Sequence, residues 1–352
     1  MKPLTEDEKW MGRCLQLARC GQLGAPPNPM VGAVLVADGH IIGEGYHRRC
    51  GQAHAEVNAF ASVTRPDLLQ RAKMYVSLEP CAHWGRTPPC ARLIVEKGIR
   101  QVVVGCVDPF ARVHGEGIRI LREAGIQVTV GVREKECLQL NRRFVVNQTQ
   151  GRPYIMLKWA ESADGFIDRL RADGTPVRFS TTRSSLRTHR LRAACQAIMV
   201  GRRTALLDNP RLNVRLTDGP QPLRIVLDSQ GTLPPSLHLF DGSQPTLVAG
   251  FHDNPLRQNS SAAYEFLALQ PHDGILPQVL DHLHARGIQS LLVEGGARLH
   301  QSFLEAHLWD EIHVEKSPVS LGSGLPAPRI PVQAHTEEET ALGSRFIHAW
   351  MP

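Results

Sequence analysis

The chain has 352 residues, 42% of them hydrophobic, which is the length and composition of about two globular domains. Its formal net charge is +6 at pH 7, but basic and acidic residues are interspersed, without the basic stripe that favours nucleic acid. No apolar run is long enough to span a bilayer, and the N-terminus lacks the apolar core of a signal peptide. We therefore expect a cytoplasmic protein whose eight scattered cysteines are thiols or metal ligands, and whose positive excess suits anionic small molecules.

Strands and short helices alternate along the first 150 or so residues. Apolar residues at helical spacing predict a helix over 5–21, and Asp38-Gly39 between two apolar runs predicts a β-hairpin. The further expected elements are helices over 55–63, 91–97, 117–124 and 134–147, and strands over 73–78, 101–107 and 126–130. This alternation predicts a sheet with a parallel part, covered by helices on both faces. The polar segment 148–153 is the expected linker to a second domain.

Three candidate metal ligands lie in this first half. His54 begins the helix over 55–63, and Cys81 and Cys90 bracket a turn-forming stretch after a strand. One imidazole and two thiolates suit a catalytic zinc, which takes three protein ligands and leaves a fourth position for water. Glu56 is better placed to move a proton than to share the ion, as in zinc-dependent base deaminases. Each cysteine alone could be an ordinary buried thiol, but the combination favours zinc.

The second half begins with a strand and turn over 154–165, and Ser180-Thr181-Thr182 is expected to cap a helix that ends at Ala194. Strands follow over 197–201 and 223–229, and a strand, glycine turn and helix over 290–299. In that last segment, Gly295 and Gly296 would let the backbone approach a phosphate near a helix N-terminus. The turn lacks the G-x-G-x-x-G pattern of a Rossmann unit, so a tight strand-to-helix connection explains it equally well.

The segment from Pro80 to Cys90, Pro-Cys-Ala-His-Trp-Gly-Arg-Thr-Pro-Pro-Cys, resembles the deaminase half of the bifunctional riboflavin-biosynthesis deaminase/reductases. That family carries Pro-Cys-x-His-x-Gly-[Arg/Lys]-Thr-Pro-Pro-Cys, whereas the general deaminase pattern is Pro-Cys-x-x-Cys. The segments 28–32 and 45–47 fit the same family. In the second half, the segments 158–165, 204–215 and 294–299 resemble the reductase half of the same enzymes.

The resemblance implies a fold and an activity for each half. Residues 1–148 would form a cytidine-deaminase-like α/β/α sandwich, and residues 149–352 a dihydrofolate-reductase-like α/β domain. The first would use zinc to deaminate 2,5-diamino-6-(5-phosphoribosylamino)pyrimidin-4-one by hydrolysis. The second would use NADPH to reduce the ribosyl group to ribityl. The expected partner is this small phosphoribosylated pyrimidine, in a homo-oligomer that engages neither nucleic acid nor membrane.

The resemblance also implies roles for individual residues. The zinc ligands would be His54, Cys81 and Cys90, with Glu56 as the catalytic acid/base. The deaminase substrate would meet Asn28, His47, His83 and Arg86. NADPH would lie along Glu161, Thr204, Asp208, Ser229, Gly295, Gly296, Ala297, Arg298 and Leu299. The reductase substrate would meet Arg192, Leu212, Arg215 and Glu294, and the arginines suit its phosphate through forked hydrogen bonds.

Three segments depart from the family's pattern. Phe166 follows Asp164-Gly165 where a basic residue is usual, and 176–180 replaces Ser-x-Trp-Ile-[Thr/Ser]. In the first half, Phe110 stands where the family's Asp-Pro-Asn-Pro has asparagine. One alternative is therefore a deaminase whose second domain is a degenerate ligand-binding or oligomerisation module. Another is a nucleic-acid base deaminase, although the long cysteine spacing and the lack of an aromatic and basic stripe argue against it.

Overall fold

The chain divides into two units, Met1–Gly151 and Arg152–Pro352. The structure is a computed structural model, and it describes residues 3–84, 88–110, 115–170, 175–258 and 263–351. Within these residues, no helix is both long enough and apolar enough to cross a membrane.

The first unit is a five-stranded sheet with strand order β2-β1-β3-β4-β5. Its elements are α1 (Glu6–Arg19), β1 (Gly32–Ala37), β2 (His40–Tyr46), α2 (Ala55–Ala61), η1 (Pro66–Arg71), β3 (Lys73–Leu78), α3 (Cys90–Glu96), β4 (Gln101–Cys106), α4 (Glu116–Glu123), β5 (Gln127–Val130), α5 (Glu134–Leu140) and α6 (Arg142–Gln150). β1 is antiparallel to β2 and β3, whereas β3, β4 and β5 are parallel. The predicted hairpin and the predicted parallel part are both confirmed.

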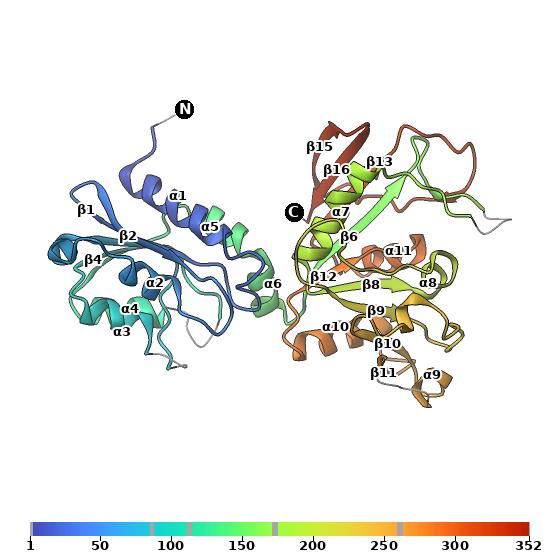
Figure 1. Cartoon of the computed structure of the whole chain (residues 1–352), viewed down its shortest axis with the longest axis horizontal. Helices are drawn as coiled ribbons and strands as arrows, with labels where there is room; N and C mark the ends of the chain where they lie inside the picture. Colours follow the sequence, from blue (N-terminus) through green and yellow to red (C-terminus); the bar gives the residue numbers. More distant parts are fainter. Residues whose placement is uncertain (1–2, 85–87, 111–114, 171–174, 259–262, 352) are drawn as a thin grey trace. The chain divides into compact units, whose positions relative to one another are not determined.

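Helices cover both faces of this sheet, with α1 and α5 on one side and α2, α3 and α4 on the other (Figure 1). β1 shows why both layers are needed, because all six of its residues are buried. Val34 and Val36 pack in a core with α1, whereas Ala33 and Leu35 pack in a separate core with α2. Successive side chains of a strand point to opposite faces, so a strand that is apolar at every position must be covered twice.

The single helix expected over 134–147 is wrong, because the chain breaks it into α5 and α6 at Asn141. The Asn141 side chain accepts the N–H of Met30 at 2.8 Å and donates to the Met30 carbonyl at 2.9 Å. The break therefore serves a contact with the loop before β1, 111 residues away in the sequence. α6 then continues to Gln150, so residues 148–150 of the expected linker are helical, and Gly151 at φ +65° follows as a C-terminal glycine.

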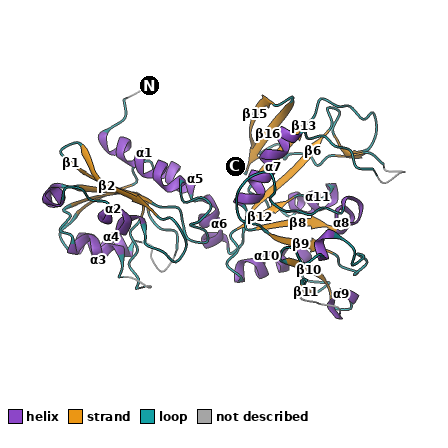
Figure 2. Ribbon diagram, in the orientation of Figure 1, coloured by secondary structure: helices purple, strands orange, loops and turns teal. Residues whose placement is uncertain are grey.

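The second unit is built on a nine-stranded sheet with order β11-β10-β9-β8-β12-β6-β13-β16-β15 (Figure 2). Strands β14 and β7 form a small separate pair. Its elements are β6 (Tyr154–Glu161), β7 (Phe166–Asp168), α7 (Thr182–Ala194), β8 (Ala197–Gly201), α8 (Arg202–Asp208), β9 (Leu223–Leu227), η2 (His238–Phe240), β10 (Thr246–Phe251), α9 (Pro255–Gln258), β11 (Glu265–Leu269), α10 (Ile275–Ala285), β12 (Ser290–Val293), α11 (Ala297–Glu305), β13 (Glu311–Lys316), β14 (Leu325–Pro326), β15 (His335–Ala341) and β16 (Ser344–Trp350).

The seven strands from β11 to β13 are parallel, and only β16 and β15 at one edge run antiparallel to their neighbours. Apolar side chains of α10 and α11 pack with the central strands in one core. The predicted cap of α7 is confirmed, since the Thr181 hydroxyl accepts the N–H of Ser184 at 3.1 Å. The carboxyl ends of β9, β8 and β12 meet at one edge of the sheet, which is where parallel sheets bind ligands.

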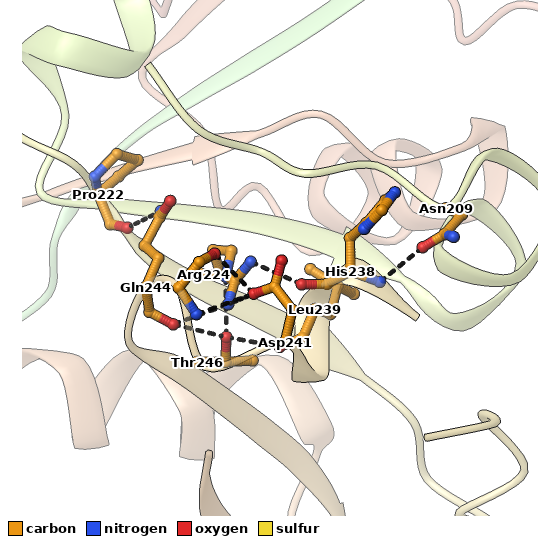
Figure 3. A network of polar contacts seen from close by, with 9 residues as sticks. Asn209, Pro222, Arg224, His238, Leu239, Asp241, Gln244 and Thr246 are labelled. Atoms are coloured by element: carbon orange, nitrogen blue, oxygen red, sulfur yellow. Dashed lines mark hydrogen bonds and ion pairs between the residues drawn. The ribbon is translucent and has the colours of Figure 1, made fainter. Parts of the chain in front are cut away.

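A buried arginine organises the loop between β9 and β10 (Figure 3). Arg224 is fully buried, and its guanidinium donates to the carbonyls of His238 at 2.8 Å and Gln244 at 2.7 Å. It also donates to the Thr246 hydroxyl at 2.8 Å and lies 3.3 Å from an Asp241 oxygen. One side chain thus satisfies several acceptors of this loop at once.

We expect Arg224→Met to lower the free energy of unfolding by about 3 kcal/mol or more, because it leaves buried acceptors unpaired without creating a large cavity. Urea unfolding of the full chain measures this change. The matched control is Arg286→Met, which removes an exposed ion pair with Glu265 and should cost less than about 1 kcal/mol. Equal unfolding midpoints for the two variants would contradict a stabilising role of the Arg224 network.

Candidate active sites

The three predicted zinc ligands come together in the first unit. His54 lies at the N-cap of α2, Cys81 follows β3, and Cys90 is the first residue of α3. The Nδ1 atom of His54 lies 3.5 Å from Sγ of Cys81 and 3.4 Å from Sγ of Cys90. All three ligand atoms lie within 4.8 Å of one another, and no other group of this kind occurs among the described residues.

These distances fit a zinc ion. A tetrahedral zinc with Zn–S of about 2.3 Å and Zn–N of about 2.0–2.1 Å separates neighbouring nitrogen and sulfur ligand atoms by about 3.6 Å. Hydrogen bonding to the Cys90 thiol and to the His54 ring lowers the pKa of Cys81 well below its usual range, whereas the Cys81 sulfur and burial raise the pKa of Cys90. A lowered thiol pKa favours metal capture, because the thiolate is the form that binds the ion.

Glu56 is the second residue of α2 and is only 3% exposed. Burial, and next the neighbouring Cys81, raise the pKa of Glu56 to about 7. Its carboxyl group and the Cys90 thiol also affect each other: Cys90 lowers the pKa of Glu56, and Glu56 raises the pKa of Cys90. A general acid/base works best when its pKa lies near the working pH, so this carboxyl group can both take up and release a proton beside the three ligand atoms.

Two of the predicted deaminase substrate residues, Asn28 and His47, lie next to this cluster. The His47 ring packs edge-on against His54, with ring centroids 5.5 Å apart. Its Nδ1 atom lies 3.1 Å from the Ala53 carbonyl, which can only accept, so Nδ1 carries the hydrogen and Nε2 accepts from the Asn28 amide at 3.1 Å. Burial lowers the pKa of His47, which agrees with this neutral form.

His83 is exposed in the segment between the two cysteines, and Arg86 lies outside the described residues. The structure adds a residue that the sequence did not single out, Asp108. It follows β4 as Cys81 follows the neighbouring parallel strand β3. Burial raises the pKa of Asp108 to about 6, and the charges of His83 and Cys81 both act on its carboxyl group. The sequence could have indicated Asp108 by its position just after an apolar strand, because ligands of parallel sheets bind at the carboxyl ends of the strands.

In the second unit, Arg192 and Glu294 form a forked ion pair, with N–O distances of 2.8 and 2.7 Å. Both side chains are only 11% exposed. Although burial opposes it, the Arg192 charge lowers the pKa of Glu294. The remaining guanidinium nitrogen of Arg192, Nη1, donates to the Asn213 carbonyl at 3.1 Å. All three guanidinium nitrogens of Arg192 are therefore bound inside the protein.

Arg215 is the exposed arginine of this group, and one of its arms donates to the Asn213 side chain at 3.0 Å. Leu212, on the same segment, is buried and has a positive φ of 52°. His189, which no sequence motif singled out, accepts the Arg215 backbone N–H through its Nδ1 atom at 3.2 Å. Burial, and next the charges of Arg192 and Arg215, hold the pKa of His189 at about 4. Its position three residues before Arg192 in α7 was the available signal.

Several predicted cofactor residues follow neighbouring parallel strands. Thr204 comes after β8, Ser229 after β9, and the Gly295-Gly296 turn after β12. A Cβ atom on Gly296 would lie 3.2 Å from the Thr204 hydroxyl, so the turn and the first residues of α8 approach closely. Ala297, Arg298 and Leu299 begin α11.

Two other predicted cofactor residues have different surroundings. The Glu161 carboxylate accepts from the Trp159 indole at 2.9 Å and lies 3.4 Å from Lys316. Asp208 ends α8 and is exposed. A ligand that met Glu161 would therefore compete with contacts already made inside the protein.

Two family models match the chain. The model described as the cytidine and deoxycytidylate deaminase zinc-binding region matches residues 4–106. The model of the RibD C-terminal domain matches residues 153–342. The two matches fall on the two units, and the predicted pair of α/β domains is confirmed.

Similar proteins match along almost the whole chain. The riboflavin biosynthesis protein RibD of Bacillus amyloliquefaciens is 38% identical over 324 residues, which are 91% of this chain and 86% of that protein. The RibD of Aquifex aeolicus is 38% identical over 322 residues, which are 91% of this chain and 89% of that protein. A diaminohydroxyphosphoribosylaminopyrimidine deaminase/5-amino-6-(5-phosphoribosylamino)uracil reductase from Thermotoga maritima has a TM-score of 0.87 at 34% identity and covers 99% of both chains. Acinetobacter baumannii RibD has a TM-score of 0.86 at 33% identity and covers 98% of both.

Proposed function

The chain belongs to the RibD family of bifunctional riboflavin-biosynthesis enzymes, with a deaminase half and a reductase half, and we propose which residues carry each reaction. The proposed substrate is 2,5-diamino-6-(5-phosphoribosylamino)pyrimidin-4-one. The first unit replaces its exocyclic amine by oxygen through hydrolysis, and the second reduces the ribosyl group to ribityl with NADPH.

In the deaminase, we propose that His54, Cys81 and Cys90 hold zinc. The bound ion supplies Lewis-acid chemistry that lets water act as a nucleophile near neutral pH. Glu56 takes a proton from the water that adds to the amine-bearing ring carbon, and delivers a proton to the amine, which leaves as ammonia. The observation that carries this proposal is the cluster of three ligand atoms within 4.8 Å with Glu56 buried beside it.

The substrate-binding part of the proposal concerns Asn28, His47, His83 and Arg86. The Asn28 amide, which the neutral ring of His47 orients, offers its carbonyl oxygen and its second N–H to the pyrimidine edge, and the His47 ring lies next to the ligand atoms as a surface for the substrate. His83 and Arg86 would hold the phosphate, for which a cationic side chain is suited.

In the reductase, we propose that Arg215 meets the substrate phosphate. Arg192 orients Glu294, its partner in the buried ion pair, toward the same ligand, and Leu212 lies on the segment that carries Arg215. The proposed cofactor residues are Glu161, Thr204, Asp208, Ser229 and the turn and helix start over 295–299. The hydride chemistry belongs to NADPH, and these residues bind and orient it.

We expect Arg215→Ala to weaken binding of the deaminated substrate by about 1.5–3 kcal/mol, roughly a factor of 10 to 150, because it removes a charged hydrogen-bond donor. NADPH affinity should stay within about 2-fold, a change below about 0.4 kcal/mol, since Arg215 is assigned to the substrate alone. Fluorescence titration with NADPH, followed by its oxidation on adding deaminated substrate, measures both. The control is Arg190→Ala, an exposed arginine of α7.

The same titration separates the alternatives. A wild-type chain that deaminates but binds no NADPH at millimolar concentration would have a second unit that serves ligand binding or oligomerisation only. Deamination of a single-stranded nucleic acid but not of the free pyrimidine would identify a nucleic-acid base deaminase. The proposal also includes a cytoplasmic homo-oligomer without nucleic-acid or membrane partners, and light scattering of the purified chain tests its assembly.

A further inference from the structure

A buried carboxylate, Glu79, stands beside the candidate zinc site without a role in the reaction described so far. It lies between β3 and Cys81 and is 4% exposed. One of its carboxylate oxygens accepts the backbone N–H groups of Gly117 at 2.9 Å and Ile118 at 3.2 Å. The other accepts those of Asp108 at 3.2 Å and Gly115 at 2.9 Å. Four backbone donors from the segment after β4 thus converge on one side chain.

The first consequence concerns Cys81. The Glu79 backbone N–H donates to the Cys106 carbonyl at 3.0 Å, so Glu79 is still tied to the sheet. A Cβ atom on Gly117 would lie 1.9 Å from the Pro80 carbonyl oxygen, which means that the start of α4 packs directly against this peptide. On its other side, the Cys81 carbonyl accepts the N–H of Ala91 at 3.2 Å. The backbone of Cys81 is therefore held between α3 and the start of α4, whose N–H groups Glu79 binds.

The second consequence concerns Asp108. Its N–H is bound to Glu79, while its buried carboxyl group feels the charges of His83 and Cys81. Glu79 therefore sets two things at once, the path of the chain into Cys81 and the position of Asp108, which follows the parallel strand next to β3. A residue that merely capped α4 would touch only the N–H groups at the start of that helix.

We propose that Glu79 is a positioning residue of the deaminase reaction, which holds Cys81 in metal-binding geometry and Asp108 beside it. This inference rests on the proposed function of the first unit. Groups that orient metal ligands from outside the coordination shell typically change metal affinity or activity by about 10- to 100-fold when they are replaced. Glu79 acts through the backbone and not through the ligand atom itself, but the same need for a fixed ligand position applies.

The test uses Glu79→Gln in the full chain. An amide places an NH₂ group opposite two of the four N–H donors in either orientation, so it breaks half of the network at nearly unchanged volume. We expect zinc to be lost to a competing chelator at about 10- to 100-fold lower chelator concentration, and the deaminase kcat to fall by about 10- to 100-fold. The thiolate-to-metal absorption of the cobalt-substituted chain should shift. NADPH oxidation with deaminated substrate, which belongs to the second unit, should not change.

The matched control is Glu44→Gln, which breaks the partly exposed ion pair of Glu44 with Arg13 in the same unit. It should alter stability alone. If Glu79→Gln changes only the unfolding midpoint, as Glu44→Gln does, while zinc affinity, cobalt spectrum and kcat stay unchanged, Glu79 is a helix cap and the proposal is overturned.

A second variant covers the case in which Glu79→Gln does not fold. Gly117→Ala keeps the carboxylate but pushes a methyl group against the Pro80 carbonyl, and it should weaken zinc binding in the same direction. Unchanged zinc affinity in a folded Gly117→Ala chain would then reject the proposal. The wild-type chain is measured first: failure to bind zinc or to deaminate would overturn the proposed function itself, separately from any effect of Glu79.

Discussion

Replacing Glu56 with glutamine should lower the rate of deamination by about 10²- to 10⁴-fold, the usual share of general acid–base catalysis, while zinc stays bound. The amide has almost the shape of the carboxyl group but cannot take a proton from water and pass it to the amine. Because Glu56 is buried, water cannot easily stand in for the lost carboxylate. Steady-state deamination and zinc content of the same preparation measure the two parts of the expectation.

The control for Glu56→Gln is Glu116→Gln, which removes an exposed carboxylate that pairs with Arg119 in α4. Its deamination should match the wild type, and reduction of the deaminated substrate should be unchanged in both variants. Normal deamination by Glu56→Gln would show that another group moves the proton, and the assignment of Glu56 would be wrong.

Cys81→Ser and Cys90→Ser should each remove the zinc, of which the wild-type chain should hold about one equivalent, and with it all deamination. A serine hydroxyl is a poorer ligand than a thiolate, because it stays protonated near neutral pH and is a harder donor. Elemental analysis of the purified variants measures the loss.

Cys106→Ser is the matched control for the cysteine variants. Cys106 is 1% exposed, like Cys90, and its thiol lies 3.5 Å from the Ser77 carbonyl. A serine there can make the same contact, so zinc should remain at about one equivalent per chain. Cys14, Cys20, Cys137 and Cys195, which also lie outside the cluster, should be equally replaceable. Full zinc in both Cys81→Ser and Cys90→Ser would exclude the assigned ligand set.

Local chemistry explains which elements could be predicted. Asp38 and Gly39 both have positive φ, 51° and 75°, as a tight hairpin turn requires, and such a turn is visible from two residues. Thr181 caps α7 through an N–H only three residues away. The cluster of His54, Cys81 and Cys90 could be predicted because these residues belong to short motifs with characteristic spacing.

Other features could not be predicted, because partners distant in the sequence create them. Asn141 breaks a helix in order to bind Met30, and nothing near Asn141 indicates that partner. Arg192 and Glu294, 102 residues apart, were both expected to face the substrate, but the structure pairs them with each other. Strands β10, β11, β13, β15 and β16 went unassigned, and they complete the nine-stranded sheet.

By itself, therefore, the sequence determined the two α/β halves, the family, and the residues of the candidate zinc site with Glu56 beside them, because periodicity and short motifs encode these within a few turns of chain. Only the tertiary structure decided which charges are already paired, and that Arg215, unlike the buried Arg192, is exposed. It also decided that the carboxylate of Glu79 binds the N–H groups of Asp108 and of the start of α4. The physical reason is that burial and hydrogen bonding depend on segments that meet only when the sheets assemble.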